Sequence, residues 1–296
     1  MLRRYLQLIC AVLLLAPAAA TAGSSQAPAV LIHGFDGGPE DFRGTAAVLA
    51  SRGFDPLLLE WQPASAEGVM QVAHGVIEPA IEALLEEAGY GPDSSFHLLG
   101  HSLGGLLARV LLEQPRPGAT LAPRVLSLVM LSTPNQGART GIARAACHTY
   151  LHPIWRPLAC DMVHGSAFLD ALGDSRPEAV QAPYLSIGVE ANGLYFPACP
   201  YDGDGDGRRS SHDNAVMAEA AWLGDTPFVL WRGRTQSNHF RAPCSSVVNG
   251  WIADFMSDGT VPVAEARRVP SGNSCHGISK KDWLGAREAE AGGGSP

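Results

Sequence analysis

Six short runs of the chain are almost continuously apolar, and longer segments with a helical repeat separate them. The runs that we interpret as strands cover residues 29–34, 56–61, 96–100, 125–133, 183–190 and 227–233. A strand with water on one face alternates apolar and polar residues, whereas a parallel strand buried on both faces is apolar throughout. The pattern therefore predicts an α/β protein with a mostly parallel sheet of six strands or slightly more, flanked by helices.

The helical segments have recognisable start and stop residues. Four of them are clear, at residues 39–53, 69–89, 102–114 and 245–256. The first has Pro39 near its start and Gly53 at its end, as capped helices often do, and Pro79 interrupts the second. These segments fit the crossovers between parallel strands.

Two segments break the alternation of strands and helices. Residues 134–182 contain apolar side chains and two cysteines but no strand pattern, which is typical of either a cap (lid) insertion or a plain surface excursion. Residues 257–296 follow the last clear helix and end in the polar sequence REAEAGGGSP. We expect this C-terminal extension to be partly mobile.

The first residues have the pattern of a cleaved export signal. Arg3 and Arg4 precede an apolar run over residues 6–15, and a small-residue A-x-A site follows at residues 20–22. The run is shorter than the ~20 residues that span a bilayer, so we expect no stable membrane insertion. We therefore expect a secreted or periplasmic protein with a signal peptide over residues 1–22, an α/β domain over 23–256 and the extension over 257–296.

Composition narrows the range of partners and metals. The formal net charge is −8, and an acidic chain argues against binding to nucleic acid. Of the six cysteines, Cys10 would leave with the signal, and no C-x-x-C pair exists. Structural disulfides are therefore more plausible than a zinc or redox site in an exported protein. The sequence does not indicate the oligomeric state.

The sharpest motif is GHSLGG at residues 100–105. It contains G-x-S-x-G with Ser102 at its centre, a predicted strand before it and a predicted helix after it. Such a turn strains the serine backbone, so its flanks must be small, as Gly100, Gly104 and Gly105 are. The helix N-terminus after Ser102 presents positive charge to a developing oxyanion. We therefore interpret Ser102 as a nucleophile.

Three motifs in order resemble those of the α/β-hydrolase lipases and esterases of bacteria. HGFDGG (33–38) stands after the first strand, GHSLGG (100–105) at the nucleophile and LSTPNQG (131–137) after the fourth strand. The resemblance covers residues 28–256. It implies the α/β-hydrolase fold and the chain order serine, acid, histidine.

The resemblance also implies which residues assist the serine. The oxyanion hole would consist of the Leu103 and Phe35 backbone N–H groups, with His33 organising the Phe35 loop; His33 as the base is the less favoured alternative. His239 lies in the loop between the last strand and the last helix, in the sequence NHF, and is the expected base.

The catalytic acid should lie between the last two strands. The acidic residues there are Glu190, Asp202, Asp204, Asp206, Asp213 and Asp225. Asp213 fits best because Asn214, which tolerates a left-handed turn, and then apolar residues follow it. Glu190 directly ends a strand and is the second choice. A bond between Cys199 and Cys244 would join the acid and histidine loops, and one between Cys147 and Cys160 would hold the cap; both pairings are hypotheses.

A competing pair stands later in the chain. SDGTVPVAEA (257–266) also resembles an acid motif, with His276 further on. However, Asp258 follows a predicted helix rather than a strand, and the pair would leave His239 without a role. Asp258 with His276 is therefore the minority alternative.

The acidic run before Asp213 also resembles a calcium loop. Asp202, Asp204 and Asp206 have the D-x-D-x-D-G spacing, and Asp213 would then take position twelve. Arg209 at position eight and prolines at 197 and 200 disfavour this interpretation. A solvated connector is preferred, although a calcium site of another kind on the first three aspartates stays open.

Together these features predict a serine hydrolase that cleaves carboxylic esters through Ser102, His239 and Asp213. The resemblance favours a lipase acting on lipid or small esters, and no cofactor is expected. A short-chain carboxylesterase, a polyester depolymerase and an acyltransferase would share every motif. A non-catalytic binding protein is disfavoured because the serine and histidine are both kept.

Overall fold

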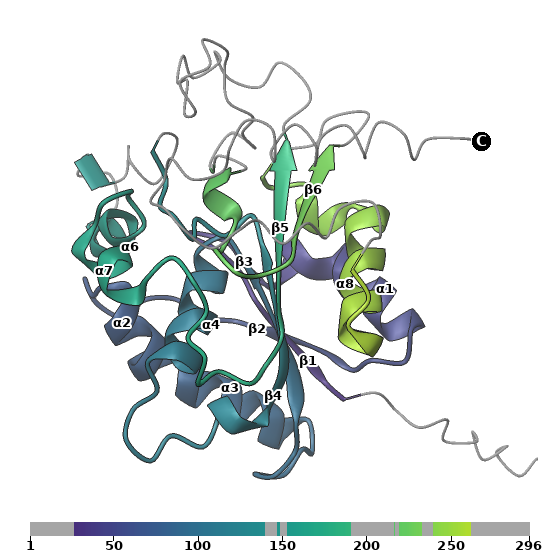
Figure 1. Cartoon of the computed structure of the whole chain (residues 1–296). Helices are drawn as coiled ribbons and strands as arrows, with labels where there is room; N and C mark the ends of the chain where they lie inside the picture. The colour runs from purple at the N-terminus through teal and green to yellow at the C-terminus, as the bar shows by residue number, and fades with distance from the viewer. Residues whose placement is uncertain are drawn as a thin grey trace, which may run out of the picture.

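Six parallel strands form one sheet at the centre of the molecule. The computed structural model describes residues 27–139, 147–148, 153–190, 216, 219–232 and 239–261. The strands are β1 (Ala29–Ile32), β2 (Pro56–Leu59), β3 (Phe96–His101), β4 (Val125–Leu131), β5 (Tyr184–Glu190) and β6 (Phe228–Arg232), in the order β2-β1-β3-β4-β5-β6 (Figure 1). Every neighbouring pair is parallel, so the predicted sheet is confirmed.

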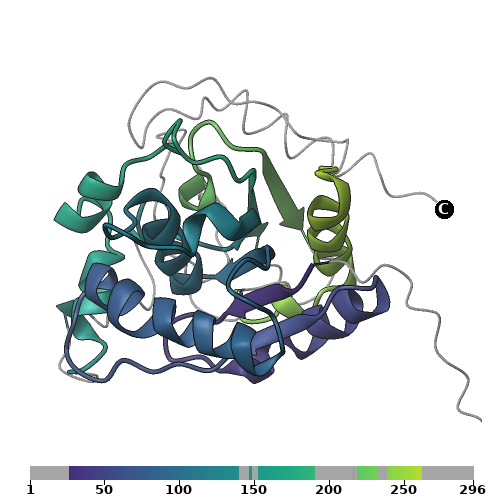
Figure 2. The same ribbon diagram turned by 90° about the horizontal axis from the view of Figure 1, so that it is seen from below.

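Helices cover both faces of this sheet. As Figures 1 and 2 show, α1 (Arg43–Ser51) and α8 (Ser246–Asp258) lie on one face, and α2 (Val69–Val72), α3 (Glu78–Glu87) and α4 (Leu103–Glu113) lie on the other. Successive strand residues point to opposite faces. Leu31 accordingly packs in a core with α1 and α8, whereas Ile32 packs in a core with α2, α3 and α4. Two buried faces are the reason that the strands are apolar throughout.

The long helical segment predicted over residues 69–89 is divided as its proline suggested. A π-helical turn, η2 (Ala73–Ile77), separates α2 from α3, and Pro79 lies in the first turn of α3. Proline has no N–H, and the first turn of a helix has no internal acceptor for one. The backbone stays helical from α2 through η2 into α3, and the wider π turn just before Pro79 accommodates a residue that has no N–H to donate.

Short helices fill the connections at the two edges of the sheet. In the described ranges, four of them are 3-10 turns: η1 (Pro39–Phe42), η3 (Ala122–Arg124), η4 (Glu219–Ala221) and η5 (Ala242–Cys244). Within the described part of the segment expected to form a cap, the helices are α6 (Arg156–Asp161) and α7 (Ala167–Leu172), and they lie on the α2 side of the sheet (Figure 1).

Several predictions fall outside the described residues. They are the signal peptide over residues 1–22, most of the C-terminal extension with His276, the aspartates at 202, 204 and 206, Asp213 and Cys199. Among the helices that the structure describes, none has the length and apolarity needed to cross a membrane.

Candidate active site

Ser102 occupies a tight turn between β3 and α4. β3 ends at His101 and α4 begins at Leu103, and Ser102 between them has φ 55° and ψ −125°. Positive φ is costly for a residue with a side chain and persists only where the surroundings enforce it. The Ser102 N–H donates to the Leu131 carbonyl at 2.9 Å, at the end of the neighbouring strand β4. The serine is thus held at the carboxyl edge of the sheet by its neighbours.

The glycines of the turn allow backbones to touch. A Cβ at Gly104 would overlap the carbonyl of Ile32 in β1, and one at Gly105 would overlap the Thr133 side chain after β4. A Cβ at Gly100 would overlap the backbone of Gly105. The start of α4 therefore rests directly on the ends of β1 and β4, which explains the run of glycines in GHSLGG.

The loop after β1 lies against the serine. A Cβ on Gly34 would stand 2.8 Å from Ser102 Cβ and 3.4 Å from Ser102 Oγ. The loop turns at once, because the Gly37 N–H donates to the Gly34 carbonyl at 3.2 Å and Asp36 has φ 52°. Phe35, whose N–H was expected to bind an oxyanion, is therefore next to a residue in contact with the nucleophile.

His33 is buried and organises this loop, as expected. Its Nδ1 donates to the Gly34 carbonyl at 3.0 Å, and its own carbonyl accepts from Trp61 Nε1 at 3.3 Å. Its ring stacks on Trp61, with 5.1 Å between centroids. Burial lowers the pKa of His33, so the ring is held in its neutral form.

His239 lies beside the residue that precedes the nucleophile. Its carbonyl accepts a hydrogen bond from His101 Nε2 at 3.0 Å, and the two rings are 4.7 Å apart between centroids. Because the acceptor is a carbonyl, His101 carries its proton on Nε2. His239 is buried, while the Phe240 side chain next to it is 60% exposed. Residues distant in sequence are thus brought together at the turn that contains Ser102.

The contact between His101 and His239 was not predicted, because His101 occupies the variable position of G-x-S-x-G. Its partner is 138 positions away in the chain, so no local signal indicated the contact. The only available hint was a second histidine directly beside the nucleophile.

Asp213, the favoured acid, lies outside the described residues, whereas Val216 and the η4 turn further along the chain are described. Val216 is buried, and η4 is bonded to the loop that follows β4. Asn135 Nδ2 donates to the Ala221 carbonyl at 2.8 Å, and the Gln136 N–H donates to the Ala220 carbonyl at 3.0 Å. The motif TPNQG therefore connects the end of β4 to the segment that follows the proposed acid. Glu190, the second choice, ends β5.

The Asn135 side chain is also bonded to a buried ion pair between Arg109 and Glu113. Arg109 of α4 is fully buried, with its Nε 2.8 Å from Glu113 Oε1 and its Nη2 2.9 Å from Glu113 Oε2. The same guanidinium donates to the Gly173 carbonyl at 2.9 Å and to Asn135 Oδ1 at 3.4 Å. Burial raises the pKa of Glu113, and the charge of Arg109 opposes that rise. The pair links α4, the end of α7 and the loop after β4.

Asp258 lies far from Ser102. The starts of α1 and α8 are close together, since a Cβ on Gly44 would stand 3.2 Å from Cys244 Cα, and their ends meet where Arg52 pairs with Asp254 at 3.1 Å. α1 leads from the carboxyl edge to the start of β2, so α8 runs the same way and ends at the amino edge. Asp258 is exposed there and accepts from the Thr260 N–H at 2.8 Å. This position disfavours the alternative pair.

One of the two expected disulfide pairings is present in the structure. Cys147 and Cys160 form a disulfide, with their Cα atoms 4.7 Å apart, as expected for this pair. Cys244 is exposed and has no disulfide partner among the described residues, and the Cys199 that was expected to bind it lies outside them. The second pairing therefore stays a prediction.

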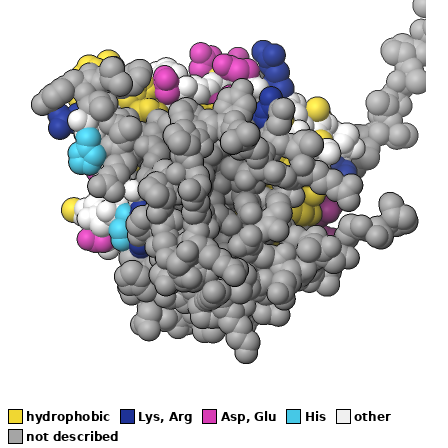
Figure 3. All heavy atoms as spheres, turned by 90° about the horizontal axis from the view of Figure 1, so that it is seen from above, with side chains coloured by type: hydrophobic (Ala, Val, Ile, Leu, Met, Phe, Trp, Pro, Cys, Tyr) yellow, Lys and Arg dark blue, Asp and Glu magenta, His cyan; other side chains and the backbone are white. Residues whose placement is uncertain are grey.

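Described side chains are visible on part of the face above the carboxyl edge (Figure 3). Figure 3 looks toward this edge, and the described side chains visible there include hydrophobic, acidic, basic and histidine groups. Within the described residues, no group of three or more His, Cys, Asp and Glu side chains is placed to hold a metal ion.

Comparisons with known proteins identify solved structures of similar fold. No family model and no curated protein matches the sequence. Among solved structures, a mature lipase from Bacillus licheniformis, BlEst2, has a TM-score of 0.56 at 17% identity, over 80% of this chain and 94% of that chain. The chain spans about half of the propeptide form of the same lipase, 52% of its length.

Two further structures are similar. Phospholipase PlaB from Legionella pneumophila has a TM-score of 0.59 at 12% identity, over 90% of this chain and 64% of that chain. Aspergillus fumigatus lipase B has a TM-score of 0.51 at 16% identity, over 92% of this chain and 63% of that chain. At such identities the likeness concerns the fold. Together with the parallel six-stranded sheet and the strand-to-helix turn at Ser102, it shows that the chain has the α/β-hydrolase fold.

Proposed function

We propose that the protein is an exported serine hydrolase that cleaves carboxylic esters, and that its substrates are lipid esters. The observation that carries this proposal is the strained Ser102, with the Gly34 loop in contact on one side and buried His239 beside its neighbour His101. Ser132 after β4 also has positive φ, at 51°, but Ser102 differs from it in standing at the N-terminus of helix α4, where a developing oxyanion is stabilised. The cost of that conformation is explained if its hydroxyl reacts.

In the proposed reaction, these residues act in two steps. His239 takes the proton of Ser102 as Oγ attacks the ester carbonyl, and the carbonyl oxygen becomes an oxyanion bound by the Phe35 and Leu103 N–H groups. The C–O bond to the alcohol then breaks, and His239 gives its proton to the leaving alkoxide. Water attacks the acyl-enzyme by the same route and releases the acid and Ser102. Asp213 orients the His239 ring and stabilises its charged form.

Lipid esters are favoured over other esters by two observations. The exposed apolar residues Phe240 and Ile154 are next in sequence to buried His239 and to buried Trp155, which precedes α6. The similar solved structures include two lipases and a phospholipase. Export is supported by the disulfide, because such bonds persist in oxidising compartments.

Hydrolysis of p-nitrophenyl butyrate and p-nitrophenyl palmitate tests this proposal. Ser102→Ala should lower kcat by at least about 10⁴-fold, and Asp213→Asn by about 10⁴-fold, because each removes a part of the proton-transfer chain. Asp225→Asn is the matched control: its carboxylate is exposed and, among the described residues, accepts from the Arg176 N–H at 3.1 Å, so the rate should not change.

The outcomes separate the alternatives. Full activity in Ser102→Ala would refute the serine mechanism. Turnover of the butyrate but not the palmitate would identify a short-chain carboxylesterase instead of a lipase. Loss of activity in Glu190→Gln but not in Asp213→Asn would move the acid to the end of β5.

A further inference from the structure

We propose that Trp155 in the cap is a positioning residue for the oxyanion hole, acting through the side chain of Phe35. The inference rests on the proposed function, since it concerns how the Phe35 N–H is aimed. It assigns the cap a catalytic effect that does not depend on opening or closing.

Trp155 joins the cap to the loop after β1 through an unbroken set of aromatic contacts. Its ring centroid lies 4.8 Å from that of Phe35, at 58°, and 5.5 Å from that of Trp61, at 57°. Trp61 in turn stacks on His33 and donates to the His33 carbonyl. Trp155 is only 7% exposed. His33 and Phe35, which stand on either side of Gly34, therefore belong to one aromatic cluster with Trp61 and Trp155.

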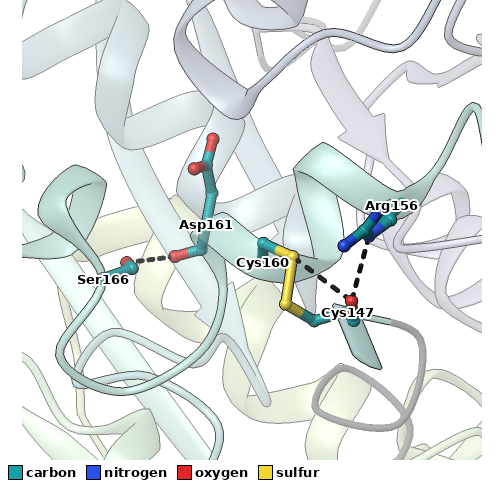
Figure 4. Close-up of a disulfide and its surroundings, with 5 residues drawn as sticks. All are labelled: Cys147, Arg156, Cys160, Asp161 and Ser166. Carbon is teal, nitrogen blue, oxygen red and sulfur yellow. Dashed lines mark hydrogen bonds between the residues drawn. A yellow bond between two sulfur atoms is a disulfide. The ribbon is translucent and has the colours of Figure 1, made fainter. Parts of the chain in front are cut away.

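The helix that presents Trp155 is itself fixed in place. Trp155 directly precedes α6, where the disulfide joins Cys147 to Cys160 and Arg156 Nε donates to the Cys147 carbonyl at 3.1 Å (Figure 4). At the end of α6, Asp161 Oδ2 accepts from the N–H of Val69 at the start of α2, at 2.8 Å. A fixed helix can hold a fixed ring against Phe35.

The loop that contains Phe35 needs support from the Trp155 ring, because its glycines allow its backbone many conformations. Phe35 stands between Gly34 and Asp36, which has positive φ, and two more glycines follow at residues 37 and 38. Oxyanion stabilisation requires donors that are aimed before the charge develops, and losing one donor costs about 10²- to 10³-fold in kcat. A displacement of about 1 Å can cost ~10²-fold. Removing the Trp155 ring leaves Phe35 without its cap partner, so its N–H should lose alignment.

A matched pair of substrates measures how well the Phe35 N–H is aligned with the oxyanion. The wild type, Trp155→Ala and Trp155→Phe are compared on an ester and on the thionoester with sulfur in place of the carbonyl oxygen. Sulfur accepts hydrogen bonds weakly, so the thionoester gains little from the oxyanion hole. Rates are expressed per active site, counted by titration with a fluorophosphonate, so that misfolded protein is not included.

Trp155→Ala should lower kcat on the ester by about 10- to 100-fold with little change in KM, and should lower the ester-to-thionoester rate ratio by a similar factor. Trp155→Phe keeps an aromatic ring at the position and should retain the ratio within about threefold. Leu172→Ala is the control for general damage: it removes a buried apolar side chain from the neighbouring cap helix α7, and should lower Tm without changing the ratio.

The results distinguish this inference from the function on which it rests. An unchanged ratio in Trp155→Ala, with an active wild type, overturns the positioning role alone. An equal fall in the ratio for Leu172→Ala also overturns it, because the effect would then be general to the cap. A wild type that hydrolyses neither substrate refutes the proposed function and this inference with it.

Discussion

Replacing His97 with glutamine should remove part of the acid sensitivity of the fold. His97 lies in β3, where its Nδ1 is 2.8 Å from Ser127 Oγ and its ring meets the Phe54 ring edge-on at 5.5 Å. Burial lowers its pKa from 6.5 to about 4. The folded-state pKa is below the unfolded value, so the unfolded chain binds the proton first as the pH falls, and stability is lost between about pH 6.5 and pH 4.

The size of the effect follows from those two values. The full difference corresponds to about 3 kcal/mol of unfolding free energy, and about 2 kcal/mol of it is lost between pH 8 and pH 5. Burial also lowers the pKa of His33, which adds in the same direction, so the contribution of His97 must be read as a difference between proteins. Urea unfolding followed by tryptophan fluorescence, at pH 8 and pH 5, supplies that difference.

His97→Gln should lose about 2 kcal/mol less than the wild type between the two pH values, because glutamine does not titrate. Ser127→Ala is the control, since it removes the hydrogen-bond partner but keeps the imidazole; it should be less stable at pH 8 yet keep the pH difference. If His97→Gln loses as much stability as the wild type, His97 is not held neutral by burial and the reasoning fails.

Three more outcomes follow from the contacts. Asn135→Ala should lower the unfolding free energy by about 1–3 kcal/mol in urea, because it leaves the buried Ala221 carbonyl without its donor; an unchanged midpoint would contradict the role of that bond. Asp258→Asn should hydrolyse p-nitrophenyl butyrate at the wild-type rate, and a large loss would restore the alternative acid. The double variant Cys147→Ser, Cys160→Ser should be destabilised by about 3 kcal/mol, and reductant should lower the Tm of the wild type by more than that of the variant, in which the predicted Cys199–Cys244 bond would remain reducible.

The sheet could be predicted because burial on both faces makes every strand apolar along its length. Residues such as Leu31 and Ile32 point to different cores, so the apolar runs had to be continuous. The strand β1 ends at Ile32, two residues before the predicted end, because the chain must turn there to bring Gly34 against Ser102. Strand interiors are thus specified locally, whereas their ends depend on what the following loop contacts.

A site residue could be predicted only where the local geometry requires particular residue types next to it in the sequence. Ser102 was predicted because the glycines around it are required by direct backbone contacts. Arg109 gave no such signal: a charged residue in an amphipathic helix is normally solvated, yet this one is fully buried. Its partner Glu113 is one helical turn away, but Asn135 and Gly173 come from other parts of the chain. Contacts between distant segments leave no local pattern.

The most direct test of the account is to identify the residue that a fluorophosphonate modifies. The account predicts one phosphonyl group per molecule on Ser102, located by mass spectrometry of the digested protein, and parallel loss of p-nitrophenyl butyrate hydrolysis. His239→Gln should react far more slowly, because the serine then lacks its base. No modification of Ser102, or an adduct elsewhere while ester hydrolysis is lost, would contradict the claim that Ser102 is the nucleophile.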